Sequence, residues 1–97
     1  DLPYAAAKAG LNILTKGFAQ EYGPEVRVNA IMAGPFLTDI SKSWDMEVVA
    51  DRFKAFPLQR AGETGEIVGA ALYLAGAGSS FTTGAIIPVD GGRTAMR

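Results

Sequence analysis

A long run with a helical period near the start of the chain does most to restrict its fold. Apolar residues recur there at steps of three and four, which is the spacing of an amphipathic helix. These residues are Ala7, Leu11, Leu14, Phe18 and Tyr22. Gly23 and Pro24 follow directly. Because glycine favours the position after a helix and proline cannot continue the helical hydrogen bonds, the sequence predicts a helix over about residues 3–22.

A second row of small residues lies beside this apolar row. Ala6, Gly10 and Gly17 form it, with Ile13 between them. An interior glycine costs a helix about 1 kcal/mol relative to alanine, so two of them indicate close approach of another backbone. Tight packing on the chain's own sheet is one explanation.

Tyr4 and Lys8 lie one helical turn apart at the start of this helix, with three alanines between them. Residues four apart share one face of a helix. An ammonium held near a phenol favours the phenolate form, and the hydroxyl then becomes a usable proton donor or acceptor near neutral pH. The pair is a candidate for acid–base chemistry without histidine. A half-buried ring beside a solvated charge is the structural alternative.

Two short apolar runs, residues 26–32 and 85–89, have the length and β-branched content of strands. Between them the sequence predicts a second long helix at about residues 64–75. Glu63 or Thr64 can cap this helix, and Gly76 or Gly78 can end it. A strand, a helix and a strand form a βαβ unit, so we expect an α/β fold with parallel strands and a right-handed crossover. Pro88 is tolerated at a sheet edge.

The residues after the first strand are candidates for ligand binding. In open α/β sheets, ligands bind just beyond the C-terminal ends of the strands. Gly34 allows close approach of a ligand, and Pro35 restricts the backbone where the chain leaves the strand. The Thr38 hydroxyl can bond an amide or phosphate oxygen. A simple turn after a strand is the alternative.

Residues 39–56 carry several large apolar side chains, and Asp45 and Glu47 are placed to start a helix. The large side chains are Trp44, Met46, Val49, Phe53 and Phe56. The last three have helical spacing, which predicts a short helix with an apolar face.

Composition excludes several classes of function. Nine basic residues face ten acidic ones, so no basic surface indicates binding to nucleic acid or to an anionic membrane. Cysteine and histidine are absent, which rules out disulfides, thiolate or imidazole metal sites, and a Ser-His-Asp triad within these residues. No apolar run reaches the roughly 18 residues of a membrane span. With 97 residues and no initiating Met, the chain is expected to be a fragment.

Several landmarks occur in the order and approximate spacing found in the C-terminal part of a classical short-chain dehydrogenase/reductase, which the chain resembles over nearly its whole length. They are Tyr4-x-x-x-Lys8, Val26-Arg27-Val28-Asn29-Ala30-Ile31 leading to Gly34 and Thr38, Pro57-Leu58-x-Arg60-x-Gly62-Glu63, Thr83-Gly84, and Val89-Asp90-Gly91-Gly92. Two positions depart from the family pattern. Ala33-Gly34 stands where Pro-Gly is usual, and Thr64 stands where Pro is common.

The resemblance implies the C-terminal portion of one NAD(P)-binding, doubly wound parallel-sheet Rossmann domain. Residues 1–23 would form its catalytic helix, 33–57 its cofactor loop and substrate lid, and 62–92 its last helix and strand. The lid would place apolar side chains over the nicotinamide, so part of the substrate would be apolar. The first helix would pack against its mate in a second subunit of a homodimer or homotetramer, which is the other explanation for its glycines.

The resemblance also implies the chemistry. Tyr4 would exchange a proton with the oxygen of a secondary alcohol or ketone while NAD or NADP exchanges a hydride, and Lys8 would hold the nicotinamide ribose. The residues implied in cofactor binding are Tyr4, Lys8, Gly34, Pro35, Phe36 and Thr38. No metal is implied, and the location would be cytoplasmic. The general appearance is closest to 3-oxoacyl-carrier-protein reductases and glucose-dehydrogenase-like members.

The remaining parts of such an enzyme, the glycine-rich turn and the catalytic Ser and Asn, would lie upstream of Asp1. We therefore expect the 97-residue chain alone to be inactive. The alternative is a related scaffold that binds a dinucleotide or a partner without turnover, because one fold supports many functions.

Overall fold

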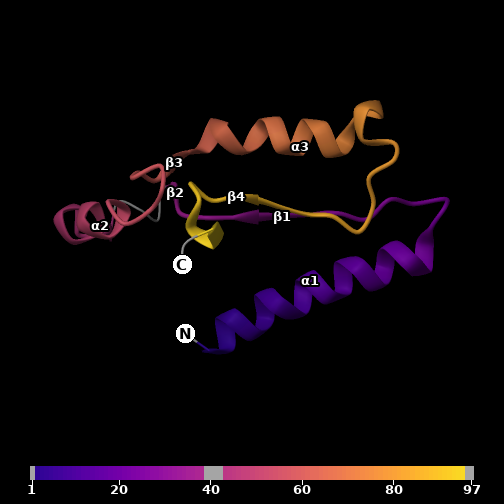
Figure 1. The fold of residues 1–97 in the computed structure, drawn as a ribbon, viewed down its shortest axis with the longest axis horizontal. Coiled ribbons are helices and arrows are strands. Elements are labelled where there is room, and N and C mark those ends of the chain that lie inside the picture. Colours follow the sequence, from indigo (N-terminus) through magenta and orange to yellow (C-terminus); the bar gives the residue numbers. More distant parts are fainter. Residues whose placement is uncertain (1, 39–42, 96–97) are drawn as a thin grey trace. The chain divides into compact units, whose positions relative to one another are not determined.

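A computed structural model describes residues 2–38 and 43–95, which contain both helices and strands (Figure 1). The elements are α1 (Leu2–Tyr22), β1 (Ala30–Ala33), β2 (Phe36–Leu37), α2 (Met46–Phe53), β3 (Gly62–Glu63), η2 (Thr64–Ile67), α3 (Val68–Ala75), η3 (Ala77–Ser79), β4 (Ile86–Val89) and η4 (Arg93–Ala95), where η marks a 3₁₀ helix. They form two compact units, one of residues 1–31 and 72–87 and the other of residues 32–71 and 88–97. The first four residues of the expected lid segment, 39–42, lie outside the described part.

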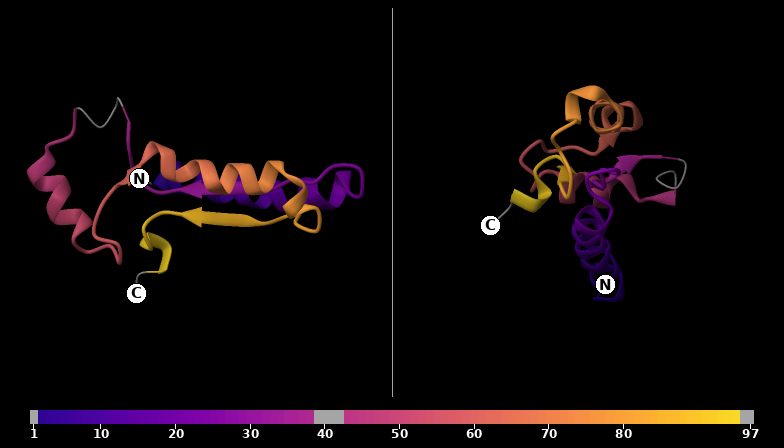
Figure 2. Two further views of the ribbon diagram at one scale, coloured as in Figure 1. Left: turned by 90° about the horizontal axis from the view of Figure 1, so that it is seen from above. Right: turned by 90° about the vertical axis from the view of Figure 1, so that its right-hand side faces the viewer.

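β1 pairs with β4, as Figures 1 and 2 show, and the two strands run parallel. The Ala30 N–H donates to the Ala85 carbonyl in the first unit, and the Gly34 N–H donates to the Val89 carbonyl in the second, each over 2.9 Å. Donors and acceptors both advance by four residues, and this constant offset is that of a parallel ladder. The expected α/β fold with parallel strands is confirmed.

The first strand is shorter at its start than the predicted range of residues 26–32. β1 begins only at Ala30 and extends one residue further, to Ala33. The Asn29 side chain explains the late start, because its amide donates to the Thr82 carbonyl (3.0 Å) and accepts from the Ala85 N–H (2.9 Å). The Asn29 side chain thus occupies the Thr82 carbonyl and the Ala85 N–H, so these groups do not pair with the backbone of a longer β1.

Arg27 fixes the chain before β1 to the end of α3. Its guanidinium donates to the Ser79 hydroxyl over 2.8 Å, to the Leu74 carbonyl over 3.2 Å and to the Thr82 carbonyl over 3.3 Å. Ser79 is fully buried. A charged donor with three acceptors therefore holds two segments of the first unit together.

The predicted first helix is confirmed as α1, which ends at Tyr22 immediately before Gly23. Its buried positions are Thr15 and Ala19, and neighbouring Lys16 donates to the Gly84 carbonyl over 3.2 Å. Ala19 lies close to Gly84, since a Cβ placed on Gly84 would be 3.5 Å from the Ala19 Cβ, an ordinary van der Waals distance.

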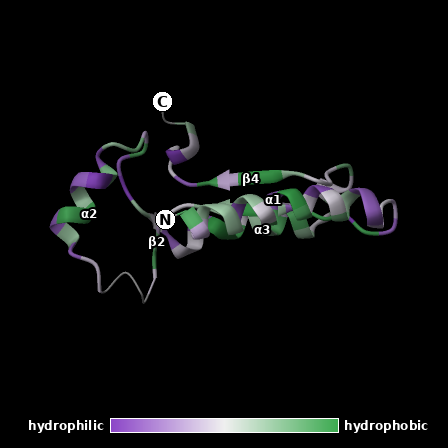
Figure 3. Cartoon of the chain, turned by 90° about the horizontal axis from the view of Figure 1, so that it is seen from below, coloured by the Kyte–Doolittle hydropathy of each residue, from purple (hydrophilic) through white to green (hydrophobic). Residues whose placement is uncertain are grey.

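The described residues cover the apolar row of α1 only in part. Its large side chains keep about half of their surface exposed: Leu11 57%, Leu14 50%, Phe18 45% and Tyr22 52%. Apolar residues along α1 are green in Figure 3. A methyl group placed on Gly10 or Gly17 would meet no atom of the described residues within 4 Å, apart from its chain neighbours and the nearby backbone of α1 itself. The structure therefore does not support tight packing on the chain's own sheet as the reason for these glycines.

The second predicted helix begins differently from expectation. Its first turn, η2, is a 3₁₀ helix with Glu63 as N-cap, and the α-helical part, α3, covers only Val68–Ala75. Gly76 follows its last residue. In the segment expected to form the lid, Asp45 caps α2 by accepting from the Glu47 N–H over 3.1 Å, as its position predicts. Within residues 2–38 and 43–95, no helix is long and apolar enough to cross a membrane.

Candidate active site

Tyr4 and Lys8 lie together on α1, in the first unit. The Lys8 ammonium nitrogen is 5.4 Å from the centre of the Tyr4 ring, which is within the range of a cation–π contact. Tyr4 is 62% exposed, so its phenol is accessible from solvent. The shared face that the four-residue spacing predicts is therefore present.

Loop 34–38, which holds the other predicted site residues, lies in the second unit and contains a short strand. Phe36 pairs with Gly62 and Leu37 with Glu63 in the parallel β2–β3 pair. The Gly62 N–H also donates to the Pro35 carbonyl over 2.9 Å. The segment is therefore not a simple turn, and this pairing was not predicted. Thr38 follows β2 and is exposed.

Two glycines allow loop 34–38 to pack closely against neighbouring residues. A Cβ on Gly34 would lie 2.6 Å from the Asp90 Cα, and a Cβ on Gly62 would lie 2.6 Å from the Phe36 ring. Both distances are shorter than real Cβ contacts allow, so neither position accepts a side chain without movement. The structure thus gives Gly34 a packing role against Asp90, and approach to a ligand remains a prediction for this residue.

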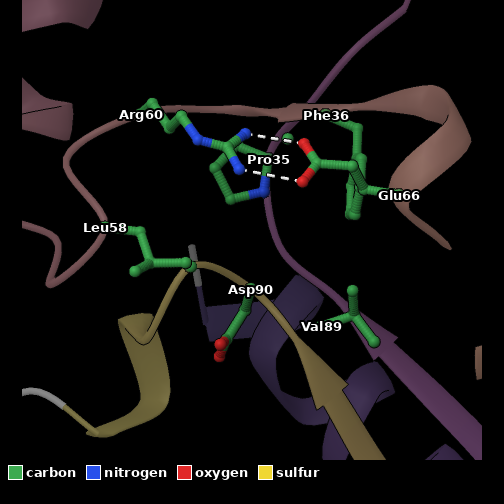
Figure 4. Close-up of a pocket in the computed structure, with 9 residues that line it drawn as sticks. Pro35, Phe36, Leu58, Arg60, Glu66, Val89 and Asp90 are labelled. Atoms are coloured by element: carbon green, nitrogen blue, oxygen red, sulfur yellow. Dashed lines mark hydrogen bonds and ion pairs between the residues drawn. The ribbon is translucent and has the colours of Figure 1, made fainter.

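Arg60 and Glu66 form a bidentate ion pair beside loop 34–38 (Figure 4). The two guanidinium nitrogens lie 2.6 and 2.8 Å from the two carboxylate oxygens. The Glu63 N–H donates to the same carboxylate over 2.9 Å. These hydrogen bonds, that from Arg60 first, lower the pKa of Glu66 from its usual 4.5 to about 2. The pair anchors β3 and, through the β2–β3 pairing, the loop.

A small cavity of about 130 Å³ lies between loop 34–38 and the end of β4 (Figure 4). Its lining residues are Pro35, Phe36, Leu58, Arg60, Gly62, Glu66, Val89, Asp90 and Gly91. Sites that enclose small-molecule ligands usually measure roughly 300–1,000 Å³, so this cavity is too small to hold a dinucleotide.

The Asp90 carboxylate accepts from the Thr94 hydroxyl over 2.7 Å, and this hydrogen bond is the main reason that the pKa of Asp90 is lowered.

A larger cavity of about 320 Å³ lies among the aromatic residues of the expected lid. Its lining residues are Pro35, Trp44, Val49, Arg52, Phe53, Phe56 and Arg93. The Phe53 ring centre is 6.5 Å from that of Trp44 and 5.5 Å from that of Phe56. We call this the aromatic cavity. Its apolar side chains were predicted, whereas its two arginines were not.

Sequence reasoning missed the supports of the loop. Arg60 and Asp90 stand in landmark motifs but were given no role, and Glu66 lies within the predicted helix of residues 64–75 without a role of its own. The three-residue spacing of Glu63 and Glu66 at the start of a helix was an available signal, because a glutamate there bonds back to the N-cap N–H. In the described part of the chain, no three His, Cys, Asp or Glu side chains gather where they could hold a metal ion.

Parallel strands joined through a helix, with a loop at the C-terminal end of β1, define the Rossmann class of α/β fold. Residues 1–94 match the family described as enoyl-(acyl carrier protein) reductase. The chain belongs to the short-chain dehydrogenase/reductase family.

Individual relatives agree with this assignment. The chain is 44% identical over 90 residues to 3-oxoacyl-[acyl-carrier-protein] reductase FabG of Chlamydia trachomatis, covering 92% of this chain and 36% of the relative. It is 45% identical over 93 residues to sorbose reductase SOU1 of Candida albicans, covering 95% and 33%. A solved 4-hydroxyisoleucine dehydrogenase mutant, complexed with NADH and succinate, is 32% identical with a TM-score of 0.89, covering 97% and 40%. The chain thus spans about a third of the length of the curated relatives that it matches.

Proposed function

We propose that the chain is the C-terminal portion of one NAD(P)-binding Rossmann domain, in an oxidoreductase that interconverts a secondary alcohol and a ketone. The observation that carries the proposal is the contact of Tyr4 with Lys8 on α1. A phenol beside an ammonium can exchange a proton with a carbonyl or alcohol oxygen near neutral pH. Membership of a family that includes carbonyl reductases supports the same chemistry.

Each residue of the pair has a distinct task in this proposal. The Tyr4 hydroxyl donates its proton to the carbonyl oxygen during reduction and removes the alcohol proton during oxidation. The Lys8 ammonium, which lies beside the Tyr4 ring, binds the hydroxyls of the nicotinamide ribose. NAD or NADP supplies the hydride when bound.

Loop 34–38, at the end of β1, is the segment to which we assign dinucleotide binding. Its backbone is held by the β2–β3 pairing, and the hydroxyl-bearing Thr38 is exposed directly after β2. A firmly held loop at the C-terminal end of a parallel strand is where α/β folds bind such ligands. We assign Gly34, Pro35, Phe36 and Thr38 to this contact. The NADH in the solved 4-hydroxyisoleucine dehydrogenase complex supports the class of cofactor.

The test uses the full-length protein that contains this chain, with Tyr4→Phe and Lys8→Met variants. Loss of the proton donor lowers kcat/KM for ketone reduction by about 10²- to 10⁴-fold, which is the usual contribution of a positioned acid or base. NAD(P)H consumption is followed at 340 nm by absorbance. Binding of NAD(P)H, followed by fluorescence, persists in the Tyr4→Phe variant.

Tyr22→Phe is the matched control, because this phenol lies on the same helix and is also about half exposed, but has no assigned part in proton transfer or cofactor binding. It keeps the activity of the unmodified protein. A Tyr4→Phe variant that reduces ketones at the unmodified rate would contradict the proposal. Binding of NAD(P)H without turnover in the unmodified protein would point to a scaffold without activity.

A further inference from the structure

We propose that the aromatic cavity binds the substrate, and that Arg52 and Arg93 bind an oxyanion group on it. The substrate class is then a carbonyl compound with an apolar body and a carboxylate or phosphate. This inference rests on the proposed alcohol–ketone chemistry and adds the substrate's charge to it.

The walls of the cavity suit an apolar body. Trp44, Phe53 and Phe56 are each half-buried, and their rings contact one another in tilted or edge-on arrangements. Side chains held in this way present fixed apolar faces to the space between them. The volume of about 320 Å³ falls within the range of small-molecule sites.

The charge of the lining is one-sided. Arg52, at the last turn of α2, and Arg93, at the start of η4, both line the cavity and are exposed. Within residues 2–38 and 43–95, no acidic side chain lines this cavity, and no carboxylate forms an ion pair with either arginine. Guanidinium groups bind carboxylate and phosphate oxygens in pairs of parallel hydrogen bonds, so an anion is the complementary ligand.

Two carboxylates of the described residues that lie near the arginines in sequence already have other partners. Asp51, next to Arg52 in sequence, pairs with Lys54 over 3.3 Å. Asp90 accepts hydrogen bonds from Thr94 and from the Gly92 N–H, and the charge of Arg93 acts on it only as a smaller influence. Neither carboxylate lines the cavity, so both guanidinium groups remain available to a ligand within the described structure.

The aromatic cavity also borders loop 34–38. Pro35 belongs to loop 34–38 and lines the aromatic cavity. A compound bound among the rings therefore lies against the loop to which we assign the cofactor. Its carboxylate or phosphate group would bind the two arginines.

The test compares ketones that share an acetylphenyl body and carry either an anionic or a neutral para substituent, using the full-length protein. The probes are 4-acetylbenzoate, 4-acetylphenyl phosphate and the neutral methyl 4-acetylbenzoate. At least one anionic ketone is reduced with a kcat/KM about tenfold or more above that of the ester, as one charged hydrogen bond allows. The better of the two anions identifies the group as carboxylate or phosphate.

In the Arg52→Met and Arg93→Met variants, the ratio of kcat/KM for the anionic ketone to kcat/KM for the ester falls towards one. The main cause is a higher KM for the anionic ketone. Lys54→Met is the matched control, because this cation is also near the end of α2 but does not line the cavity. It keeps the preference. Raising the ionic strength lowers kcat/KM for the anionic ketone more than for the ester, because salt screens exposed charges.

Titration calorimetry separates this inference from the proposed function. Anionic ketones that bind, and lose affinity in both arginine variants, support the cavity assignment even if no ketone is reduced. Reduction of all three ketones with equal kcat/KM supports the proposed function and overturns the oxyanion site. Failure of both anionic ketones to bind also overturns it.

Discussion

Glu66 accepts hydrogen bonds from both nitrogens of one guanidinium and from one backbone N–H, although it lies at the surface. These donors hold the pKa of Glu66 near 2, below the usual 4.5. A carboxylate with a lowered pKa stabilises the fold while it is ionised. Its contribution is therefore complete above about pH 4.5 and disappears as the pH falls towards 2.

We predict that Glu66→Gln removes part of the acid sensitivity of the full-length protein. The free energy of unfolding, measured in urea at stepped pH values, falls less steeply below pH 4.5 in this variant than in the unmodified protein. Arg60→Met, which removes the main cause of the lowered pKa, reduces the slope in the same direction. A Glu66→Gln variant with an unchanged slope would contradict this role of the pair.

The sequence predicts single residues best when their role is local. Tyr4 and Lys8 could be paired from their spacing alone, because one helical turn brings them together. Gly34 was expected near a ligand, but its close neighbour is Asp90, far along the chain. No local pattern indicates which backbone will lie against a glycine, so this contact could not be predicted.

Among the elements of the first unit, Arg27 connects the segment before β1 to the end of α3. We predict that Arg27→Met lowers the free energy of unfolding by about 1.5–3 kcal/mol, the usual value for hydrogen bonds to a charged group. Buried Ser79 loses one of its hydrogen-bond partners in this variant. Chemical denaturation of the full-length protein measures the change.

Arg27→Lys is the informative second variant. It keeps the charge but cannot reproduce the planar guanidinium that reaches three acceptors, so it recovers only part of the loss. Full stability in Arg27→Met would show that the three hydrogen bonds contribute nothing.

The length of an element decided how well it could be predicted. The helix α1 has several turns of periodic sequence and was predicted closely, whereas β2 and β3 are two residues each and have no detectable period. The start of β1 was placed too early because Val26 and Val28 are typical strand residues. Only the structure shows that the Asn29 side chain replaces the backbone at that point.

For the whole molecule, the exposed apolar row of α1 supports the proposed homodimer or homotetramer. Leu14 and Phe18 are about half exposed, and neighbouring Gly10 and Gly17 leave open space for a second backbone. We predict that Leu14→Glu shifts the full-length protein to a smaller species, because a buried carboxylate without a partner is costly at an interface.

Sedimentation velocity measures this shift. Gln20→Glu is the control, because Gln20 is an exposed polar residue on the same helix, so its variant keeps the original assembly. An unmodified protein that sediments as a monomer would show that no assembly exists. A Leu14→Glu variant with the original mass would show that another surface forms the assembly.

At this scale the sequence predicted the fold class and the family, because the landmark motifs are local patterns in a fixed order. It could not predict the charge of the aromatic cavity. Arg52 and Arg93 are far apart in the chain and become neighbours only when η4 and α2 line the same space. Spacing within a sequence contains no information about such a pair.

The contact between Gly34 and Asp90 also has a consequence for synthesis of the chain. A ribosome releases the N-terminal part of a protein first, so loop 34–38 emerges well before the residue against which it packs. Until Asp90 has emerged, the loop lacks this packing and its hydrogen bond to Val89. The nascent protein therefore gains its finished loop only late in translation, and a ribosome that stalls before this point leaves it incomplete.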